Sequence, residues 1–98
     1  MAEKITASAL KSQKNDFVVI DVREDDELEG GKIDGSIHMP LGLSIRNAKK
    51  KQIEDLRGKK ICTYCGTGYR GNLAADELIK EGFIAVTLEG GYPSWTQS

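Results

Sequence analysis

Short, nearly unbroken apolar runs recur along the chain, separated by longer stretches that mix apolar and polar residues. Runs rich in β-branched and aromatic residues are typical of strands that a parallel sheet buries on both faces. The strongest runs are Phe17–Val22, Ile61–Tyr64 and Phe83–Leu88. Two weaker segments, Lys4–Thr6 and Ser36–Met39, predict short strands, the second of which is stopped by Pro40.

Apolar residues at helical spacing fill the stretches between these runs. One helix is predicted from Ser44 to Gly58 and another from Gly71 to Gly82. Their apolar faces are made by Ile45, Ala48, Ile53 and Leu56 in the first and by Ala74, Ala75, Leu78 and Ile79 in the second. Shorter helical segments are expected after Thr6, in the acidic stretch that follows Arg23, and around Pro93. Strands that alternate with helices predict an α/β fold with parallel strands and right-handed crossovers.

The charge of the chain is close to neutral. Its 98 residues include 14 basic and 15 acidic side chains, which give a net charge of -1. A chain of this length builds one compact core, so a single domain over residues 1–98 is expected. The charge balance argues against nucleic acid or an anionic membrane as a partner, and no apolar run approaches the roughly 18 residues of a membrane span. The basic run Lys49–Lys51 is expected to be the solvated face of a helix.

The amino-terminal sequence, MAEKITASALK, lacks the apolar core of a signal peptide, and a start at Met1 is typical of a free-standing domain. A cytoplasmic protein is therefore expected. In that compartment the two cysteines, Cys62 and Cys65, are expected to be reduced. Reduced cysteines suit a working thiol better than a structural disulfide.

The most informative stretch is ICTYCGTGYRGNLAA, Ile61 to Ala75, in which a strand runs into a glycine-rich turn and then into a helix. Cys65 follows the strand directly and is expected at the mouth of the turn. Glycines let the turn expose its backbone amides, and a helix start carries unpaired amides and partial positive charge. Together with Arg70, these groups favour the thiolate form of Cys65. The loop therefore has the parts of a nucleophilic sulfur site.

Polar residues also end a second strand, where Asp21, Val22 and Arg23 follow an apolar run. Ligand sites of open α/β sheets lie at the carboxyl ends of the strands. Cys65 and the segment Asp21–Arg23 both fall there. The residues alone thus predict a thiol-nucleophile site on an α/β sheet and leave its substrate open.

Two residues near this site have competing explanations. Cys62 completes a CxxC pattern with Cys65, which is typical of redox pairs and zinc sites. Because Cys62 lies inside an apolar strand rather than at a helix start, a structural role is favoured, with a resolving role against a persulfide as the alternative. His38, the only histidine, is expected to be structural rather than a base for Cys65.

Two arginines are also candidates. Arg23 is expected to tie the sheet to its surroundings through carboxylates such as Glu24 or Glu27 rather than to contact substrate. For Arg70 two roles stay open: contact with the thiolate and substrate, or hydrogen bonds to backbone carbonyls that hold the shape of the loop.

Four segments in order, IDVRE, GKIDGSIHMP, CTYCGTGYR and LEGGYPSW, resemble a rhodanese-type sulfurtransferase domain from about Phe17 to Trp95. The resemblance implies an α/β fold with a five-stranded, mostly parallel sheet and helices on both faces. It also implies that Cys65 is the catalytic cysteine at the first position of a six-residue loop. The substrate-binding remainder of that loop is Gly66, Thr67, Gly68, Tyr69 and Arg70.

The chemistry implied by the resemblance is sulfur transfer. The Cys65 thiolate attacks the outer sulfur of a donor such as thiosulfate, releases sulfite and holds a persulfide. Cyanide, a small thiol or a protein acceptor then takes the sulfur, with ping-pong kinetics and without a metal or organic cofactor. Four residues separate Cys65 from Arg70, fewer than in the related phosphatase loops, so the sequence resembles the narrower, sulfur-handling loop.

The donor and the role both stay open. Gly66–Tyr69 carries no charge, and thiosulfate is a dianion, so with Arg70 as the only loop cation a persulfide is the alternative donor. An enzyme that transfers sulfane sulfur through Cys65 competes with a non-enzymatic sulfur carrier or protein-docking module of the same fold. The presence of both Cys65 and Arg70 favours the enzyme.

Overall fold

Five parallel strands form the centre of the computed structural model, which describes residues 2–98. Met1, the expected chain start, lies outside the described residues. The strand order is β1-β5-β4-β2-β3, and every neighbouring pair is parallel. The strands are β1 (Glu3–Ile5), β2 (Phe17–Asp21), β3 (Ile37–His38), β4 (Lys60–Tyr64) and β5 (Ile84–Leu88). The predicted α/β fold with a five-stranded parallel sheet is confirmed.

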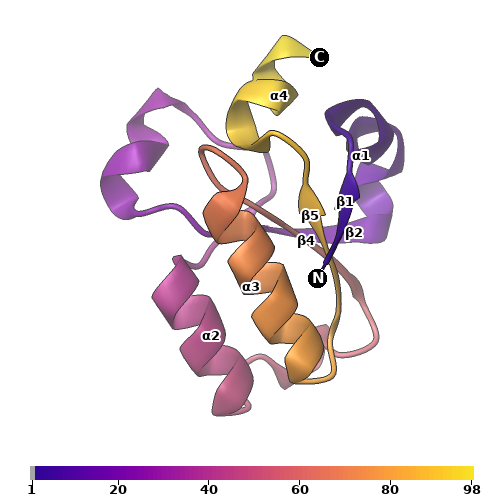
Figure 1. Ribbon diagram of the computed structural model, residues 1–98, viewed down its shortest axis with the longest axis vertical. Coiled ribbons are helices and arrows are strands. Elements are labelled where there is room, and N and C mark those ends of the chain that lie inside the picture. Colours follow the sequence, from indigo (N-terminus) through magenta and orange to yellow (C-terminus); the bar gives the residue numbers. More distant parts are fainter. Residues whose placement is uncertain (1) are drawn as a thin grey trace.

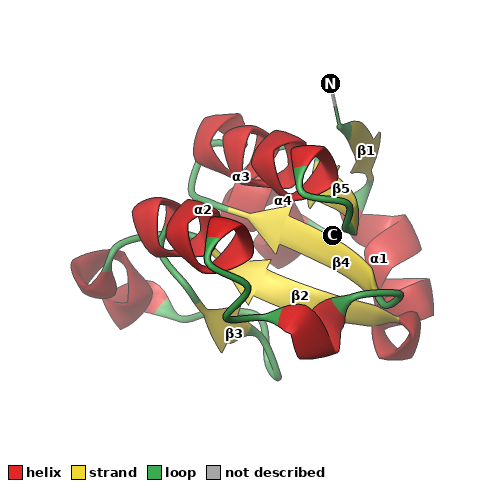
Figure 2. Ribbon diagram, turned by 90° about the horizontal axis from the view of Figure 1, so that it is seen from below, coloured by secondary structure: helices red, strands yellow, loops and turns green. Residues whose placement is uncertain are grey.

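Helices cover both faces of this sheet (Figures 1 and 2). On one face, α2 (Leu41–Lys49) and α3 (Tyr69–Lys80) lie side by side, and on the other face α1 (Ala7–Gln13) and α4 (Gly91–Gln97) contribute to a second core. Because side chains alternate along a strand, β4 sends Ile61 into the first core and Cys62 into the second. The two cores therefore lie on opposite faces of the same central strands.

The register of β2 and β4 brings their carboxyl ends to the same edge. Val19 is paired with Cys62, and Asp21 with Tyr64. Both strands are largely buried, which explains why their sequences are nearly continuous apolar runs. The segments that follow Asp21 and Tyr64 consequently leave the sheet next to each other.

The limits of α2 differ from the prediction of a helix from Ser44 to Gly58. The helix begins at Leu41, so Ser44 is not its cap, and the Ser44 hydroxyl instead donates to the carbonyl oxygen of Met39 at 2.6 Å. The chain turns at Lys51, whose φ is 60°, and a separate 3₁₀ turn spans Glu54–Leu56. Helix α3 also begins earlier than predicted, at Tyr69 rather than Gly71.

Other local predictions are confirmed. The Thr6 side chain caps α1 by accepting a hydrogen bond from the amide of Ala9 at 3.1 Å. Pro93 lies in the first turn of α4, and a 3₁₀ turn spans Asp25–Gly30 in the acidic stretch. The side chains of Lys49–Lys51 are exposed, as expected, but the run is not one face of a helix, because α2 ends at Lys49 and the chain turns at Lys51. Within residues 2–98, the structure contains no helix with the length and apolar character needed to cross a bilayer.

Candidate functional site

The loop between β4 and α3 holds the predicted nucleophile. Gly68 is the N-cap of α3 and has a φ of 103°, a left-handed conformation that glycine adopts at little cost. Its amide donates a hydrogen bond to Cys65 Sγ at 3.0 Å. The predicted meeting of a loop amide, a helix start and the sulfur is thus present, and Gly68 provides it. A donor at this position stabilises negative charge on the sulfur.

The sequence predicted Cys65 at the mouth of the loop, but its sulfur lies beneath the loop. Cys65 is 0% exposed and belongs to the core cluster on the side of α2 and α3. Thr67 and Tyr69 are exposed, and the Tyr69 side chain is 70% accessible. A substrate therefore reaches Cys65 only when groups that cover it move.

The first turn of α4 supports the loop from another direction. The amide of Tyr92 donates to the carbonyl oxygen of Cys65 at 2.8 Å. A Cβ on Gly91 would lie 2.6 Å from the same oxygen, so only glycine permits this approach. The sequence alone did not predict these residues at the site. The paired glycines of LEGGYPSW were the available signal.

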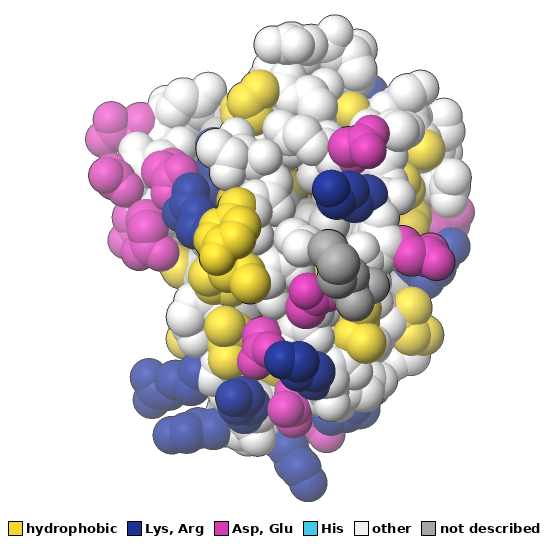
Figure 3. All heavy atoms as spheres, in the orientation of Figure 1, with side chains coloured by type: hydrophobic (Ala, Val, Ile, Leu, Met, Phe, Trp, Pro, Cys, Tyr) yellow, Lys and Arg dark blue, Asp and Glu magenta, His cyan; other side chains and the backbone are white. Residues whose placement is uncertain are grey.

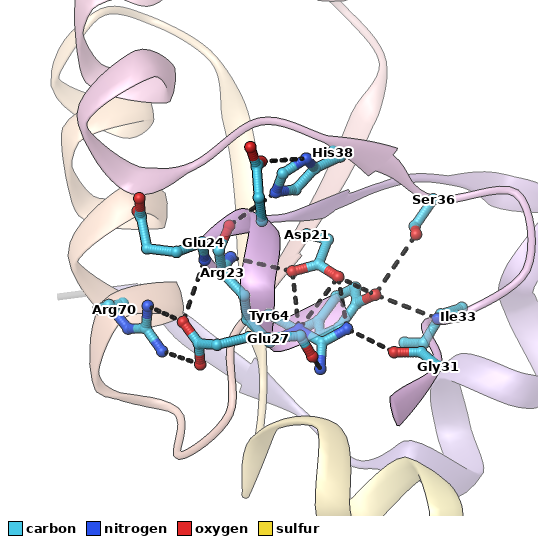
Figure 4. A network of polar contacts seen from close by, with 11 residues as sticks. Asp21, Arg23, Glu24, Glu27, Gly31, Ile33, Ser36, His38, Tyr64 and Arg70 are labelled. Carbon is cyan, nitrogen blue, oxygen red and sulfur yellow. Dashed lines mark hydrogen bonds and ion pairs between the residues drawn. The ribbon is translucent and has the colours of Figure 1, made fainter. Parts of the chain in front are cut away.

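Arg70 reaches across the site to the acidic stretch that follows β2. Its Nη1 and Nη2 donate to Glu27 Oε1 and Oε2, both at 2.6 Å (Figure 4). Of the two roles left open for Arg70, the bonds to backbone carbonyls are not formed in the part of the chain that the structure describes; a bidentate ion pair with Glu27, which the sequence did not predict, takes their place. The pair lies over the loop, since a Cβ on Gly66 would be 3.5 Å from Glu27 Oε2 and 4.0 Å from Arg70 Nη2.

The ion pair fixes the charge of Glu27. Hydrogen bonds from Arg70 and from the amide of Glu24 lower the pKa of Glu27 to about 2 from its usual 4.5. The second of these bonds belongs to a capping box, in which each of the Glu24 and Glu27 side chains accepts a hydrogen bond from the backbone amide of the other residue. Glu27 is consequently ionised and oriented at neutral pH.

We expect Glu27→Gln to lower the free energy of unfolding at pH 7 by about 1 kcal/mol, a modest cost because both partners are partly solvated. A carboxylate with a depressed pKa stabilises the fold above its unfolded value of 4.5 and loses that contribution as pH falls towards about 2. The difference between wild type and variant should therefore shrink between pH 4.5 and about 3 in urea titrations. A difference that is constant with pH would contradict the pairing.

A second, more deeply buried pair joins the end of β2 to the same acidic stretch. Arg23 Nη2 lies 2.8 Å from Asp21 Oδ2, and the side chains are 5% and 0% exposed. Arg23 also donates to the carbonyl oxygens of Glu27 at 3.1 Å and Gly31 at 2.8 Å. The structural role expected for Arg23 is confirmed. The expected partners are wrong, because its carboxylate is that of Asp21 and not of Glu24 or Glu27.

Tyr64 completes this network from β4. Its hydroxyl donates to Asp21 Oδ2 at 2.7 Å and accepts from the amide of Ile33 at 3.1 Å. Burial alone would raise the pKa of Asp21, but hydrogen bonds from Arg23 and Tyr64 together hold it below its usual value. Figure 4 shows the two ion pairs as one continuous polar network between the strand ends and the loop.

His38 and Cys62 have structural surroundings, as expected. His38 Nε2 donates to the carbonyl oxygen of Arg23 at 2.7 Å, and Nδ1 lies 3.5 Å from Asp25 Oδ1. Cys62 is buried in the core opposite that of Cys65, and burial raises the pKa of its thiol to about 12. Both cysteines are free. Across residues 2–98, no group of three or more His, Cys, Asp and Glu side chains is placed to hold a metal ion.

The fold and the loop define a class of protein: an α/β domain that presents a cysteine and a helix start at the carboxyl edge of a parallel sheet. A family model described as "Rhodanese-like domain" matches residues 6–98. The chain therefore belongs to the rhodanese-like domain family, as the four sequence segments predicted.

Named relatives agree with this assignment. The protein YqhL of Bacillus subtilis (strain 168) is 36% identical over 78 residues, a match that covers 79% of this chain and 59% of YqhL. The thiosulfate sulfurtransferase GlpE of Coxiella burnetii (strain RSA 493 / Nine Mile phase I) is 30% identical over 84 residues, covering 85% and 75% of the two chains. A rhodanese-related protein from Thermoplasma volcanium has a crystal structure with a TM-score of 0.83 and 34% identity, covering 97% of this chain and 91% of that one.

Several relatives are much longer than the matched region. The chain spans 59% of YqhL, 20% of a relative from Porphyra purpurea and 25% of a relative from Bacillus cytotoxicus. What the comparisons establish for this chain is thus the family, with relatives that are named as sulfurtransferases.

Proposed function

We propose that this chain is a sulfurtransferase that moves sulfane sulfur through a persulfide on Cys65. The observation that carries the proposal is the hydrogen bond from the Gly68 amide to Cys65 Sγ at a helix start. In a rhodanese-like domain, this arrangement supports a thiolate nucleophile and then the terminal sulfur of its persulfide.

The first half-reaction loads Cys65. The Sγ thiolate attacks the outer sulfur of thiosulfate or of a persulfide donor, a new S–S bond forms, and the donor's own sulfur–sulfur bond breaks. The electron pair leaves with sulfite or with the donor thiolate. In the second half-reaction, cyanide or a thiolate attacks the outer sulfur, and the Cys65 thiolate is the leaving group. Charge and sulfur balance in both steps, and no oxidant is required.

The other loop residues would act around this sulfur. Gly66 and Gly68 leave room for the backbone to approach the transferred atom, while Thr67, Tyr69 and Arg70 would form the substrate-facing part of the loop. Since Cys65 is 0% exposed, loading requires a displacement of the residues above it. Loops open on timescales shorter than typical turnover, so this requirement is compatible with catalysis.

The competing role is a non-enzymatic sulfur carrier or a protein-docking module with the same fold. Incubation with thiosulfate and, separately, with cysteamine persulfide distinguishes the roles when the intact mass is measured. We expect a gain of one sulfur atom that cyanide removes as thiocyanate, and steady-state rates with the parallel-line pattern of a ping-pong mechanism. A protein that gains no sulfur from either donor would overturn the proposal and favour the docking module.

A further inference from the structure

We infer that Glu27 is a specificity-determining residue that turns the Cys65 loop away from oxyanion donors such as thiosulfate. The preferred donor is then a persulfide on a neutral or positively charged carrier. The inference rests on the proposed sulfur transfer through Cys65 and names the class of donor that this site takes.

The loop cation is already neutralised. Arg70 is the only charged residue between Cys65 and Gly71, and both of its terminal nitrogens are bound to the Glu27 carboxylate at 2.6 Å. A bidentate pair of this kind saturates the guanidinium edge that recognises a planar or tetrahedral anion. Arg70 therefore offers an incoming dianion far less attraction than the sequence of the loop indicates.

The Glu27 carboxylate is also close to the backbone beside Cys65. It lies over Gly66, the residue next to Cys65, where a Cβ would be 3.5 Å from Oε2. The capping box with Glu24 holds the carboxylate there. The charges of Glu27, Cys65 and Glu24 all act on the Arg70 guanidinium and, after the hydrogen bonds to Glu27, contribute to its raised pKa. Cys65 and these carboxylates thus share one electrostatic neighbourhood.

The side chains that surround the Arg70–Glu27 pair on the acidic segment are negatively charged. The acidic segment, defined here as residues 24–29, has the sequence EDDELE and contains Glu24, Asp25, Asp26, Glu27 and Glu29. Apart from Glu27, its acidic side chains are exposed. Figure 3 shows acidic side chains gathered at the upper left, whereas the basic side chains of the same view gather mainly at the lower left, over the end of α2. The other arginine of the network, Arg23, is paired with Asp21.

A dianion that approaches Cys65 therefore meets the thiolate and the acidic segment together. Repulsion between like charges is screened less where they are partly removed from water than where they are fully exposed. Thiosulfate carries this cost twice, once for each charge. Cysteamine persulfide carries an ammonium group beside its persulfide, so the acidic segment attracts it while its terminal sulfur remains available to the Cys65 thiolate.

The test compares initial rates of sulfur loading from thiosulfate and from cysteamine persulfide in three proteins: wild type, Glu27→Gln and Glu29→Gln. Glu29 is the matched control, because it belongs to the same segment and carries the same charge but is exposed. We expect wild type to load faster from cysteamine persulfide. Glu27→Gln should raise the ratio of the thiosulfate rate to the persulfide rate by about tenfold, and Glu29→Gln by less than about twofold.

Salt provides a second measurement that does not depend on a variant. In wild type, loading from thiosulfate should speed up between about 10 mM and about 150 mM salt, because screening weakens the repulsion. A ratio that Glu27→Gln leaves unchanged, a wild type that prefers thiosulfate, or thiosulfate loading that slows with salt would each overturn the inference while leaving transfer through Cys65 intact. Failure to load from either donor would instead overturn the proposed function and the inference with it.

Discussion

Replacement of Cys65 by serine is expected to abolish sulfur loading, with a fall in transfer rate on the order of 10³-fold or more. A serine hydroxyl remains protonated at neutral pH and forms no stable bond equivalent to a persulfide. The Gly68 amide, which donates to Sγ at 3.0 Å, can still donate to the serine oxygen, so the loop should keep its shape. Intact mass after incubation with cysteamine persulfide should show no added sulfur.

The matched control is Cys62→Ala. Cys62 lies three residues earlier on β4, is fully buried, and has a thiol whose pKa is raised to about 12 by burial. Its thiol is therefore protonated below about pH 11, so it cannot act as the nucleophile at neutral pH. The alanine variant should still gain one sulfur atom. Loading that survives Cys65→Ser, or that disappears in a folded Cys62→Ala protein, would contradict the assignment of the persulfide to Cys65.

The central sheet and the position of the loop could be predicted because strands that are buried on both faces need nearly continuous apolar sequences. The strands β2 and β4 must be apolar along nearly their whole length, and their polar ends then mark the carboxyl edge. A glycine-rich turn after such a strand has few alternatives to a strand–loop–helix unit. These constraints are local in the chain, so one sequence is enough to detect them.

The limits of α2 illustrate what periodicity cannot resolve. Ile53 and Leu56 are buried at positions that also fit a helix continuing from Ile45, yet the chain turns at Lys51 and enters a separate 3₁₀ turn. Apolar spacing records which residues face the core, not whether one helix carries them all. At the other end of the helix, the sequence does not show whether Ser44 is the cap or lies inside the helix. In the structure Ser44 lies inside it, and its hydroxyl donates to the carbonyl oxygen of Met39.

The pairing of Arg70 with Glu27 was out of reach for a different reason. The partners are 43 residues apart, and the acidic segment offers several carboxylates of equal chemistry. Which of them meets Arg70 depends on how the turn Asp25–Gly30 packs beside the loop, and that is a property of the tertiary structure. Arg23 is a different case, because its partner Asp21 lies only two residues away and is not a carboxylate of the acidic segment.

The largest loss of stability is expected for Arg23→Met, at about 3–5 kcal/mol, because it leaves the Asp21 carboxylate buried without its cation. The variant also removes the hydrogen bonds to the carbonyl oxygens of Glu27 and Gly31, which hold the turn Asp25–Gly30 beside the end of β2. Methionine retains part of the packing against Tyr92, whose ring centroid lies 4.6 Å from the guanidinium carbon of Arg23. The free energy of unfolding from urea titration at pH 7 gives the magnitude.

The double variant Asp21→Asn/Arg23→Met separates charge from packing. It removes the stranded carboxylate, so it should be more stable than Arg23→Met alone, whereas a loss that came only from packing would persist in both. If Arg23→Met lowered the free energy of unfolding by less than about 1 kcal/mol, the buried Asp21 carboxylate would not depend on the Arg23 cation.

The pH dependence of Arg23→Met should reveal the same carboxylate. In wild type, hydrogen bonds hold the pKa of Asp21 below 3.8 despite burial, so the pair stabilises the fold above that pH. In the variant, burial is opposed only by Tyr64 and a backbone amide, and the pKa of Asp21 should rise above its unfolded value. The folded variant then binds a proton more tightly than the unfolded chain. Its destabilisation relative to wild type should therefore be greatest at neutral pH and decrease towards about pH 4, and an unchanged difference would exclude Asp21 as the cause.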